Sequence, residues 1–119
     1  VRVSSVHGHG LFARRRFRDG EVVSEYKGVV YDAVEIKSIP DWKFVMEVES
    51  NLFLDAKHVN SFARWINTFN TPAQEEQWGG YNVVFKRSGS RVNAVTSRVV
   101  EVGQEFFAQY DIWSPATER

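Results

Sequence analysis

Tyrosine, asparagine and glycine are the residues of this chain whose spacing could support chemistry, and they stand in four short segments. In chain order the segments are Gly8-His9-Gly10-Leu11-Phe12-Ala13, Glu25-Tyr26-Lys27-Gly28, Arg64-Trp65-Ile66-Asn67 and Gly103-Gln104-Glu105-Phe106-Phe107-Ala108-Gln109-Tyr110. Paired glycines let a backbone approach a ligand closely, and aromatic rings can hold an apolar stem or a cation. Such residues suit a reaction that depends mainly on the alignment of its reactants.

Each segment also has a plainer interpretation when it is taken alone. The paired glycines are typical of a tight turn, and Tyr26 and Tyr110 fit tyrosines packed in strands. Trp65 fits a core residue, and Asn67 fits a residue that ends a helix. His7 and His9 suggest a metal site, but nothing nearby completes a ligand set, so we expect no metal.

The elements that must position these residues are mainly strands. Short runs rich in Val, Phe and Tyr, separated by glycine or charged turns, predict strands over residues 21–26, 43–48, 81–86, 91–100 and 105–110. One short helix is predicted over residues 56–66, where apolar residues recur at spacings of three and four. This helix would place Asn67 just beyond its end.

The size and composition favour one domain without a membrane or nucleic-acid partner. A chain of 119 residues can bury one modest core, so we expect a single domain over residues 1–119. Fifteen Lys and Arg balance fifteen Asp and Glu, and cysteine is absent, which excludes disulfides and thiolate zinc sites. No apolar stretch approaches the ~20 residues of a membrane-spanning helix, so we expect a soluble protein, nuclear or cytoplasmic. The run Arg14-Arg15-Arg16-Phe17-Arg18 fits a solvated strand end better than a nucleic-acid patch.

In their order and spacing, the four segments resemble those of the SET domain family of S-adenosylmethionine-dependent protein lysine methyltransferases, over nearly the whole chain. The most telling match is Ala63-Arg64-Trp65-Ile66-Asn67, with Asp55-Ala56 upstream. The resemblance implies a mainly β, β-clip-like SET fold of several small sheets, with a threaded C-terminal segment and one or two short helices. It also implies a variable insert at about residues 31–53 and a lid at about residues 111–119, in place of a cysteine-rich zinc segment.

The resemblance assigns roles to particular residues as expectations. Tyr110 falls on the catalytic tyrosine of the family, and Tyr26 falls on the tyrosine that lines the channel for the target lysine. The implied contacts with S-adenosylmethionine come from Gly8, His9, Gly10, Leu11, Arg64, Trp65, Asn67, Thr68, Tyr110 and Trp113. The implied substrate contacts come from Tyr26, Phe85 and Phe107, and a Phe at position 85 would leave room for more than one methyl group.

The chain departs from the family pattern after Asn67. Many members continue with His-Ser-Cys-x-Pro-Asn, whereas this chain has Thr68-Phe69-Asn70-Thr71-Pro72-Ala73 and then an insertion over residues 74–80. Because that His contacts the adenine largely through its main chain, Thr68 could serve in its place. Asn82 could replace the Asn lost after the Pro. The departure bears on the affinity for the cofactor.

Three hypotheses follow. The first is an active protein lysine methyltransferase whose partner is a protein or peptide, with a histone tail in chromatin as one candidate and a homodimer as one way to complete the substrate groove. The second is a catalytically silent SET module that binds a peptide or protein, against which the retained Tyr26 and Tyr110 argue. The third is an unrelated β domain that binds nucleic acid through residues 14–18, which the neutral charge and the ordered motifs disfavour.

Overall fold

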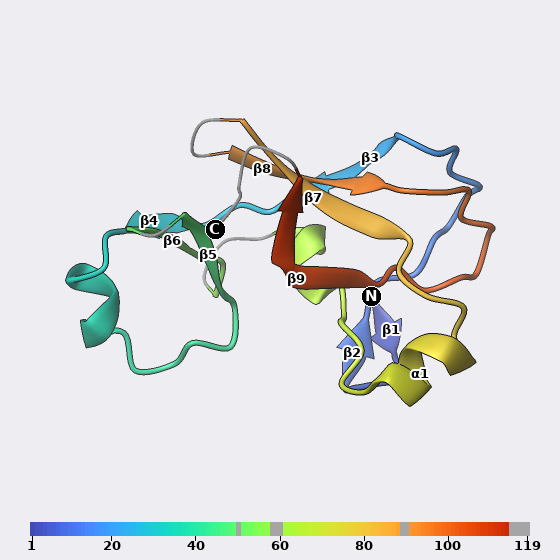
Figure 1. Ribbon diagram of the computed structural model, residues 1–119, viewed down its shortest axis with the longest axis horizontal. Coiled ribbons are helices and arrows are strands. Elements are labelled where there is room, and N and C mark those ends of the chain that lie inside the picture. The colour runs from blue at the N-terminus through green and yellow to red at the C-terminus, as the bar shows by residue number, and fades with distance from the viewer. Residues whose placement is uncertain (50, 58–60, 89–90, 115–119) are drawn as a thin grey trace.

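The computed structural model describes residues 1–49, 51–57, 61–88 and 91–114; the side chains of residues 49 and 110–114 fall outside this description. The strands form three small sheets, in the orders β1-β2, β3-β8-β7-β9 and β4-β6-β5, with little helix between them (Figure 1). The prediction of a mainly β fold of several small sheets is confirmed. The threading of the C-terminal segment stays a prediction.

The largest sheet has four strands. It consists of β3 (Val22–Glu25), β8 (Arg91–Thr96), β7 (Val83–Ser88) and β9 (Ala108–Ser114), in that order. β7 is antiparallel to β8 and parallel to β9. Along β7 the side chains of Val83 and Phe85 are buried while their neighbours are more exposed, as expected for a strand with one face on the core.

The two smaller sheets lie beside it (Figure 1). One pairs β1 (Arg2–Val3) with β2 (His9–Gly10). The other consists of β4 (Val29–Tyr31), β6 (Leu52–Asp55) and β5 (Val45–Glu49), with the 3-10 helix η1 (Glu35–Ser38) between β4 and β5 along the chain. Gly28 leads into β4, where a Cβ atom would lie 2.7 Å from the Asp55 carbonyl oxygen. The close approach of two backbones therefore requires a glycine here.

The α-helix predicted over residues 56–66 is wrong. Residues 58–60 lie outside the description, and the part that follows holds only the 3-10 helix η2 (Phe62–Trp65). Phe62 is exposed, and Ala63 is the one buried residue of η2. No continuous apolar face is therefore buried to support a longer helix. Asn67 still follows closely after this helical turn.

The one α-helix of the described residues, α1 (Pro72–Gln77), begins just before the insertion suggested by the sequence and covers part of it. Thr71 caps it by accepting a hydrogen bond from the backbone N–H of Gln74 (3.2 Å), and Pro72 stands in its first turn, as is common at helix N-termini. None of its residues is buried, so apolar periodicity could not reveal it. No helix in the described ranges has the length and apolar character to cross a bilayer.

Two predicted strands have different limits in the structure. The strand predicted over residues 91–100 stops at Thr96, and Val100 instead forms an isolated bridge with Phe17. The strand predicted over residues 105–110 becomes regular only at Ala108. The residues before it form isolated bridges with other parts of the chain, so they serve as a junction between segments.

This junction, which we call the central segment, comprises residues 105–108. The Phe106 N–H donates to the Leu11 carbonyl (2.8 Å), and the Ala108 N–H donates to the Asn67 carbonyl (2.9 Å). Isolated bridges accompany both contacts, antiparallel on the first side and parallel on the second. Two of the four sequence segments are thereby joined to a third through backbone hydrogen bonds.

Asn82 fastens the same segment from the side of β7. Its Nδ2 donates to the Glu105 carbonyl (2.9 Å), and its Oδ1 accepts from the Phe107 N–H (2.8 Å). The Asn82 side chain is buried, so these bonds satisfy groups that water does not reach. The sequence suggested that this residue replaces the Asn that the family has after the Pro, and the described contacts of its side chain are with the backbone of the central segment.

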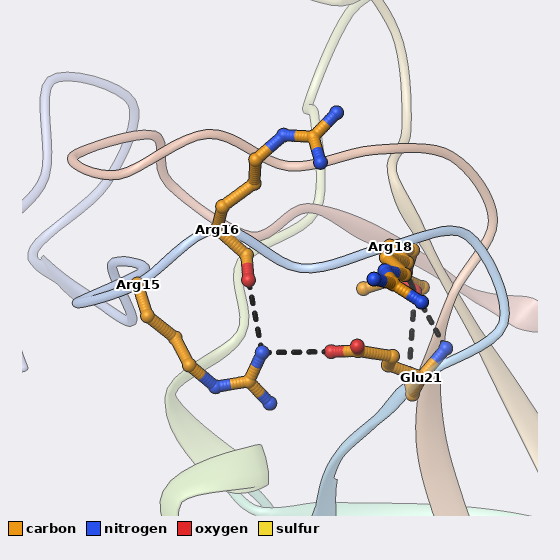
Figure 2. Close-up of polar contacts among 5 residues, drawn as sticks. Arg15, Arg16, Arg18 and Glu21 are labelled. Carbon is orange, nitrogen blue, oxygen red and sulfur yellow. Dashed lines mark hydrogen bonds and ion pairs between the residues drawn. The ribbon is translucent and has the colours of Figure 1, made fainter.

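The arginines at residues 14–18 are exposed, and two glutamates offset part of their charge. Figure 2 shows the Arg15 guanidinium between the Arg16 carbonyl (2.9 Å) and the Glu21 carboxylate (2.8 Å). Arg16 forms a second ion pair with Glu101 (3.3 Å). The hydrogen bond from Arg15 holds the pKa of Glu21 below its ordinary value. Such pairs are typical of a solvated surface.

Replacing Asn82 with alanine should lower the free energy of unfolding by about 1–3 kcal/mol, because two buried backbone groups lose their partners. Chemical denaturation followed by circular dichroism measures this change. Asn70→Ala is the matched control, since the Asn70 side chain is exposed and its loss should change stability by at most about 0.5 kcal/mol. Equal stability of the two variants would show that Asn82 does not hold the central segment.

Candidate functional site

A cavity of about 410 Å³ brings three of the four sequence segments together. Its lining comprises His7, Gly8, His9, Tyr26, Lys43, Phe44, Val45, Arg64, Trp65, Ile66, Asn67 and Thr68. The volume lies within the range of small-molecule sites, and the lining combines aromatic rings with a few polar groups, as such sites do. We call it the main cavity.

The loop at Gly8 and His9 forms one wall of the main cavity. Gly8 has φ of +46°, a left-handed conformation that glycine adopts without strain. The His9 ring lies edge-on to the Trp65 ring, with 6.1 Å between their centroids. Gly10 and Leu11, also expected to contact a cofactor, are buried and are absent from the cavity lining.

Asn67 connects this wall to the central segment. Its Nδ2 donates to the carbonyls of His7 (3.0 Å) and His9 (3.1 Å) and to Oε2 of Glu105 (2.9 Å). The side chain therefore holds the loop against the rest of the fold while one of its faces lines the cavity.

Glu105 is a buried carboxylate that the sequence analysis did not single out as a site residue. Ser4 Oγ donates to its Oε1 (2.8 Å), and Asn67 donates to its other oxygen. Burial raises the pKa of Glu105 above its ordinary value, and the two hydrogen bonds offset part of that rise. One signal in the sequence could have pointed to Glu105, namely its single charge beside the apolar pair Phe106-Phe107. A carboxylate in such a run is either buried with hydrogen-bond partners or turned to solvent.

The glycine at position 10 is explained by this carboxylate. A Cβ atom on Gly10 would lie 2.0 Å from Oε2 of Glu105 and 3.1 Å from Nδ2 of Asn67. Because both side chains are held by hydrogen bonds, neither can move away without losing a partner. The second glycine of the Gly8-His9-Gly10 segment thus makes room for a protein side chain.

Tyr26 forms a rigid part of the cavity wall. Its hydroxyl donates to the Phe44 carbonyl (2.7 Å), and its ring packs edge-on against Phe85 with 5.9 Å between centroids. Burial, followed by the negative charge of Asp55, raises the pKa of Tyr26 far above its ordinary value. The hydroxyl therefore stays protonated at physiological pH and acts as a hydrogen-bond donor.

Arg64 stands between two aromatic rings of the wall. Its guanidinium carbon lies 5.1 Å from the Phe44 ring centroid and 5.2 Å from the Trp65 ring centroid. One terminal nitrogen donates to the carbonyls of Ala56 (2.9 Å) and Lys57 (2.8 Å). Its Nε is buried without a partner, alone among the side-chain polar atoms of the described residues. This nitrogen is enclosed by protein, although Arg64 as a residue lines the cavity.

The sequence analysis missed the wall formed by Lys43, Phe44 and Val45. These residues lie in the stretch that the resemblance marks as variable, and they carry no local pattern beyond that of a strand. The Phe44 ring nevertheless packs edge-on against Trp65, with 5.3 Å between centroids. Only the folding of the three-stranded sheet against η2 brings them to the site.

Two residues expected to contact substrate lie outside the lining of the main cavity. Phe85 is fully buried and packs behind Tyr26. Phe107 packs against Phe69, with 4.4 Å between ring centroids, and lines a separate cavity. The structure thus gives Phe85 contact with the cavity wall rather than with the cavity itself.

The fourth segment reaches the site through its backbone and through the Glu105 side chain in the described part of the chain. The side chains of Tyr110 and Trp113 fall outside the description, as do residues 115–119 of the expected lid. The backbones of both residues belong to β9, where Trp113 is in register with Phe85 of β7. The roles expected for Tyr110 and Trp113 therefore stay predictions.

The chemistry that this arrangement offers is that of a binding site. His7 and His9 line the cavity, yet within the described ranges no group of three or more His, Cys, Asp or Glu could hold a metal ion. Thr68 also lines the cavity, with its hydroxyl 3.4 Å from the Tyr81 hydroxyl. Rings, an amide and a guanidinium together suit a ligand with a flat apolar part and a charged end.

Gly10→Ala should lower the free energy of unfolding by about 1–3 kcal/mol, because the new methyl group overlaps the Glu105 carboxylate. Thermal or chemical denaturation measures the loss. In a Glu105→Ala background the space is free, so the same substitution should cost much less. An equal cost in both backgrounds would mean that the carboxylate is not the reason for the glycine.

Comparison with known families agrees with the order of the segments. The family model described as SET domain matches residues 8–111. The match covers most of the 119 residues and includes all four segments, from Gly8 to Tyr110. It also includes each wall of the main cavity except His7. The chain belongs to the SET domain family.

Proposed function

We propose that this protein is a lysine methyltransferase that transfers a methyl group from S-adenosylmethionine to the ε-amine of a lysine in a protein or peptide. Members of the SET domain family are generally protein lysine methyltransferases that use this cofactor. The observation that carries the proposal is the convergence of Gly8-His9, Tyr26 and the Arg64 to Asn67 segment on one cavity. An unrelated β domain has no reason to gather these residues.

The residues of the main cavity suit this cofactor. The positive charge of Arg64, which lines the cavity, would attract the carboxylate of the methionine portion. Asn67, the backbone of Gly8 and His9, and the Trp65 ring would contact the rest of the amino acid and the nucleoside. Thr68 and the proposed lid residue Trp113 would complete the adenine side. Gly10 and Leu11, which are buried behind the cavity lining, would support the loop at Gly8 and His9 without touching the cofactor.

The substrate channel would be formed on the side of Tyr26. When bound, S-adenosylmethionine supplies a methyl group activated by a positively charged sulfur. The protein must bring in a lysine without its proton, and an unperturbed lysine has a pKa near ~10.4. Apolar rings at Tyr26 and Phe44 would remove water from the ammonium, and the Arg64 guanidinium would repel its charge, so both lower its pKa. A separate base is then unnecessary.

Tyr26 and Tyr110 have different proposed roles. The Tyr26 hydroxyl is committed to the Phe44 carbonyl, so this residue would shape the channel and would not exchange protons. Tyr110 would place its hydroxyl at the reacting centre and orient the amine. Phe85 supports Tyr26 from behind, and with Phe107 it would set how many methyl groups the channel admits, more than one in our proposal. A histone tail is one candidate substrate, and a homodimer is one way to complete its groove.

A catalytically silent SET module that binds a peptide is the second candidate. Thr68 in the place of the usual His favours it. The Thr68 side chain carries no imidazole, and its hydroxyl lies 3.4 Å from the Tyr81 hydroxyl. The candidates differ in one respect, because a silent module has no need to bind S-adenosylmethionine.

Calorimetric titration with S-adenosylmethionine and with S-adenosylhomocysteine separates the two candidates. We expect both to bind the folded chain with one-to-one stoichiometry. Mass spectrometry of lysine peptides and histones after incubation with S-adenosylmethionine then detects the transferred methyl groups. A folded chain that binds neither nucleoside would overturn the proposed function.

Tyr110→Phe should lower the rate of methyl transfer at least about tenfold, equivalent to ~1.4 kcal/mol in the barrier, because it removes one hydroxyl from the proposed reacting centre. The affinity for S-adenosylhomocysteine should stay within about twofold. Tyr31→Phe is the matched control, since Tyr31 lies on β4 and outside the cavity lining. Wild-type activity in Tyr110→Phe would assign catalysis to another residue.

A further inference from the structure

Two further cavities adjoin each other beside Tyr26. The first, of about 290 Å³, is lined by Ser24, Glu25, Lys27, Ser61 and Phe62. The second, of about 370 Å³, is lined by Glu25, Tyr26, Lys27, Gly28, Val30, Leu54 and Arg91. Because they share Glu25 and Lys27, we treat them as one surface and call it the outer groove.

The outer groove meets the main cavity at Tyr26. This tyrosine is the one residue that lines both. In methyl transfer the amine approaches the methyl carbon from the side opposite the sulfur, so the lysine needs a route apart from the space that the cofactor fills. The outer groove offers such a route, since it reaches Tyr26 without sharing any other described wall of the main cavity.

The described charges of the outer groove are one carboxylate and two cations. Arg91 donates to both oxygens of Glu25, from Nη2 at 2.9 Å and from Nε at 3.3 Å, and this hydrogen bonding holds the pKa of Glu25 below its ordinary value. The carboxylate is therefore ionised at neutral pH and already has a cationic partner. Lys27 is exposed and forms no hydrogen bond or ion pair with a described residue. The described lining thus has one positive charge in excess.

Both cations remain accessible to a partner. The Arg91 side chain is 73% exposed, and a guanidinium has more N–H donors than the pair with Glu25 uses. The Lys27 ammonium group can donate in any direction that the flexible stem allows. A carboxylate brought into the groove could therefore pair with either cation without breaking the existing ion pair.

Exposed apolar side chains flank these charges. Phe62 lines the first cavity and is 63% exposed, and Val30 lines the second and is 47% exposed. The Ser61 hydroxyl donates to the Glu25 carbonyl, which fixes the start of η2 beside β3 and so keeps Phe62 at the groove. Apolar side chains that gather on a surface in this way are typical of a site that binds another chain.

We propose that the outer groove selects a substrate in which an acidic residue stands within a few positions of the target lysine, because Lys27 and Arg91 attract its carboxylate. The inference rests on the proposed function and adds the substrate class. Lys27 directly follows Tyr26, so the carboxylate that it binds must belong to a near neighbour of the lysine that enters there. The same charges disfavour a segment whose neighbours are Lys or Arg, as in a basic histone tail.

Acetylated heptapeptides with a central lysine and otherwise alanine and serine test this preference. Glutamate is placed in turn at each of the four nearest positions, and matched sets carry glutamine or arginine there. Mass spectrometry of competing mixtures with S-adenosylmethionine gives ratios of kcat/KM. At the best position we expect glutamate to exceed glutamine at least about threefold, the size of a solvent-exposed ion pair, and arginine to rank last. Added sodium chloride should reduce the preference by screening.

Variants of the two cations assign the preference to the groove. Lys27→Gln and Arg91→Gln should each lower the ratio of glutamate to glutamine peptides toward one, and Lys27→Glu should reverse the order of the glutamate and arginine peptides. Loss of folding cannot produce a reversal, which makes this variant the sharpest. Lys37→Gln is the matched control, since Lys37 is an exposed lysine of η1 outside the outer groove and the main cavity, and its ratio should equal that of the wild type.

The outcomes separate this inference from the proposed function. A wild-type chain that neither binds S-adenosylhomocysteine in calorimetry nor methylates any peptide overturns both. Binding without methylation of any of these peptides, or methylation without a preference for glutamate, overturns the inference alone. A preference that stays unchanged in Lys27→Gln and Arg91→Gln would originate elsewhere and would likewise overturn it.

Discussion

The hydrogen bonding of residues 105–108 is the constraint on which the rest of the structure depends. This short segment accepts or donates backbone hydrogen bonds on two sides, to Leu11 and to Asn67, and the buried Asn82 side chain holds it on a third. Unpaired backbone groups in such a place would cost about 1–3 kcal/mol each. The segments at Leu11, Asn67 and Asn82 are therefore held together by a few hydrogen bonds, and the loss of any one of them would destabilise the fold.

The geometry of the site follows from that junction. Because Asn67 joins the junction through its backbone and the N-terminal loop through its side chain, the loop and the η2 segment face each other across one cavity. Phe44, which directly precedes β5, closes the cavity, and the Tyr26 hydroxyl holds Phe44 by its carbonyl. Two glycines belong to this arrangement for steric reasons, Gly10 against a carboxylate and Gly28 against a backbone. In both cases the missing Cβ atom leaves space for another part of the chain, and not for a ligand.

The polar groups of the site divide into satisfied and unsatisfied ones. The Tyr26 hydroxyl has a partner, and its raised pKa keeps it neutral, so it contributes shape. The Glu105 carboxylate has hydrogen bonds but no described counter-charge, and the Arg64 guanidinium has an unused donor. A chain with no net charge thus still presents local charge at this site, because electrostatic fields depend on the nearest groups.

The sequence by itself determined the mainly β class, the strands at residues 43–48 and 81–86 to within a few residues, and the family. These features depend on local patterns, namely alternation, glycine turns and the order of short motifs. The same local reasoning was wrong about the helix at residues 56–66, since spacing of apolar residues does not say whether their face is covered. It also missed α1, whose residues are all outside the core.

Only the tertiary structure decided what the site is made of. Ser4 and Glu105 meet although they lie 101 positions apart, and Asn67 and Glu105 meet across 38 positions. Phe44 reaches the cavity only because its sheet folds against η2. No local propensity encodes such contacts, because they form when distant segments bury their polar groups together. The sequence therefore named the residues of the motifs, and the packing of residues 105–108 decided which of them face the cavity and which support it.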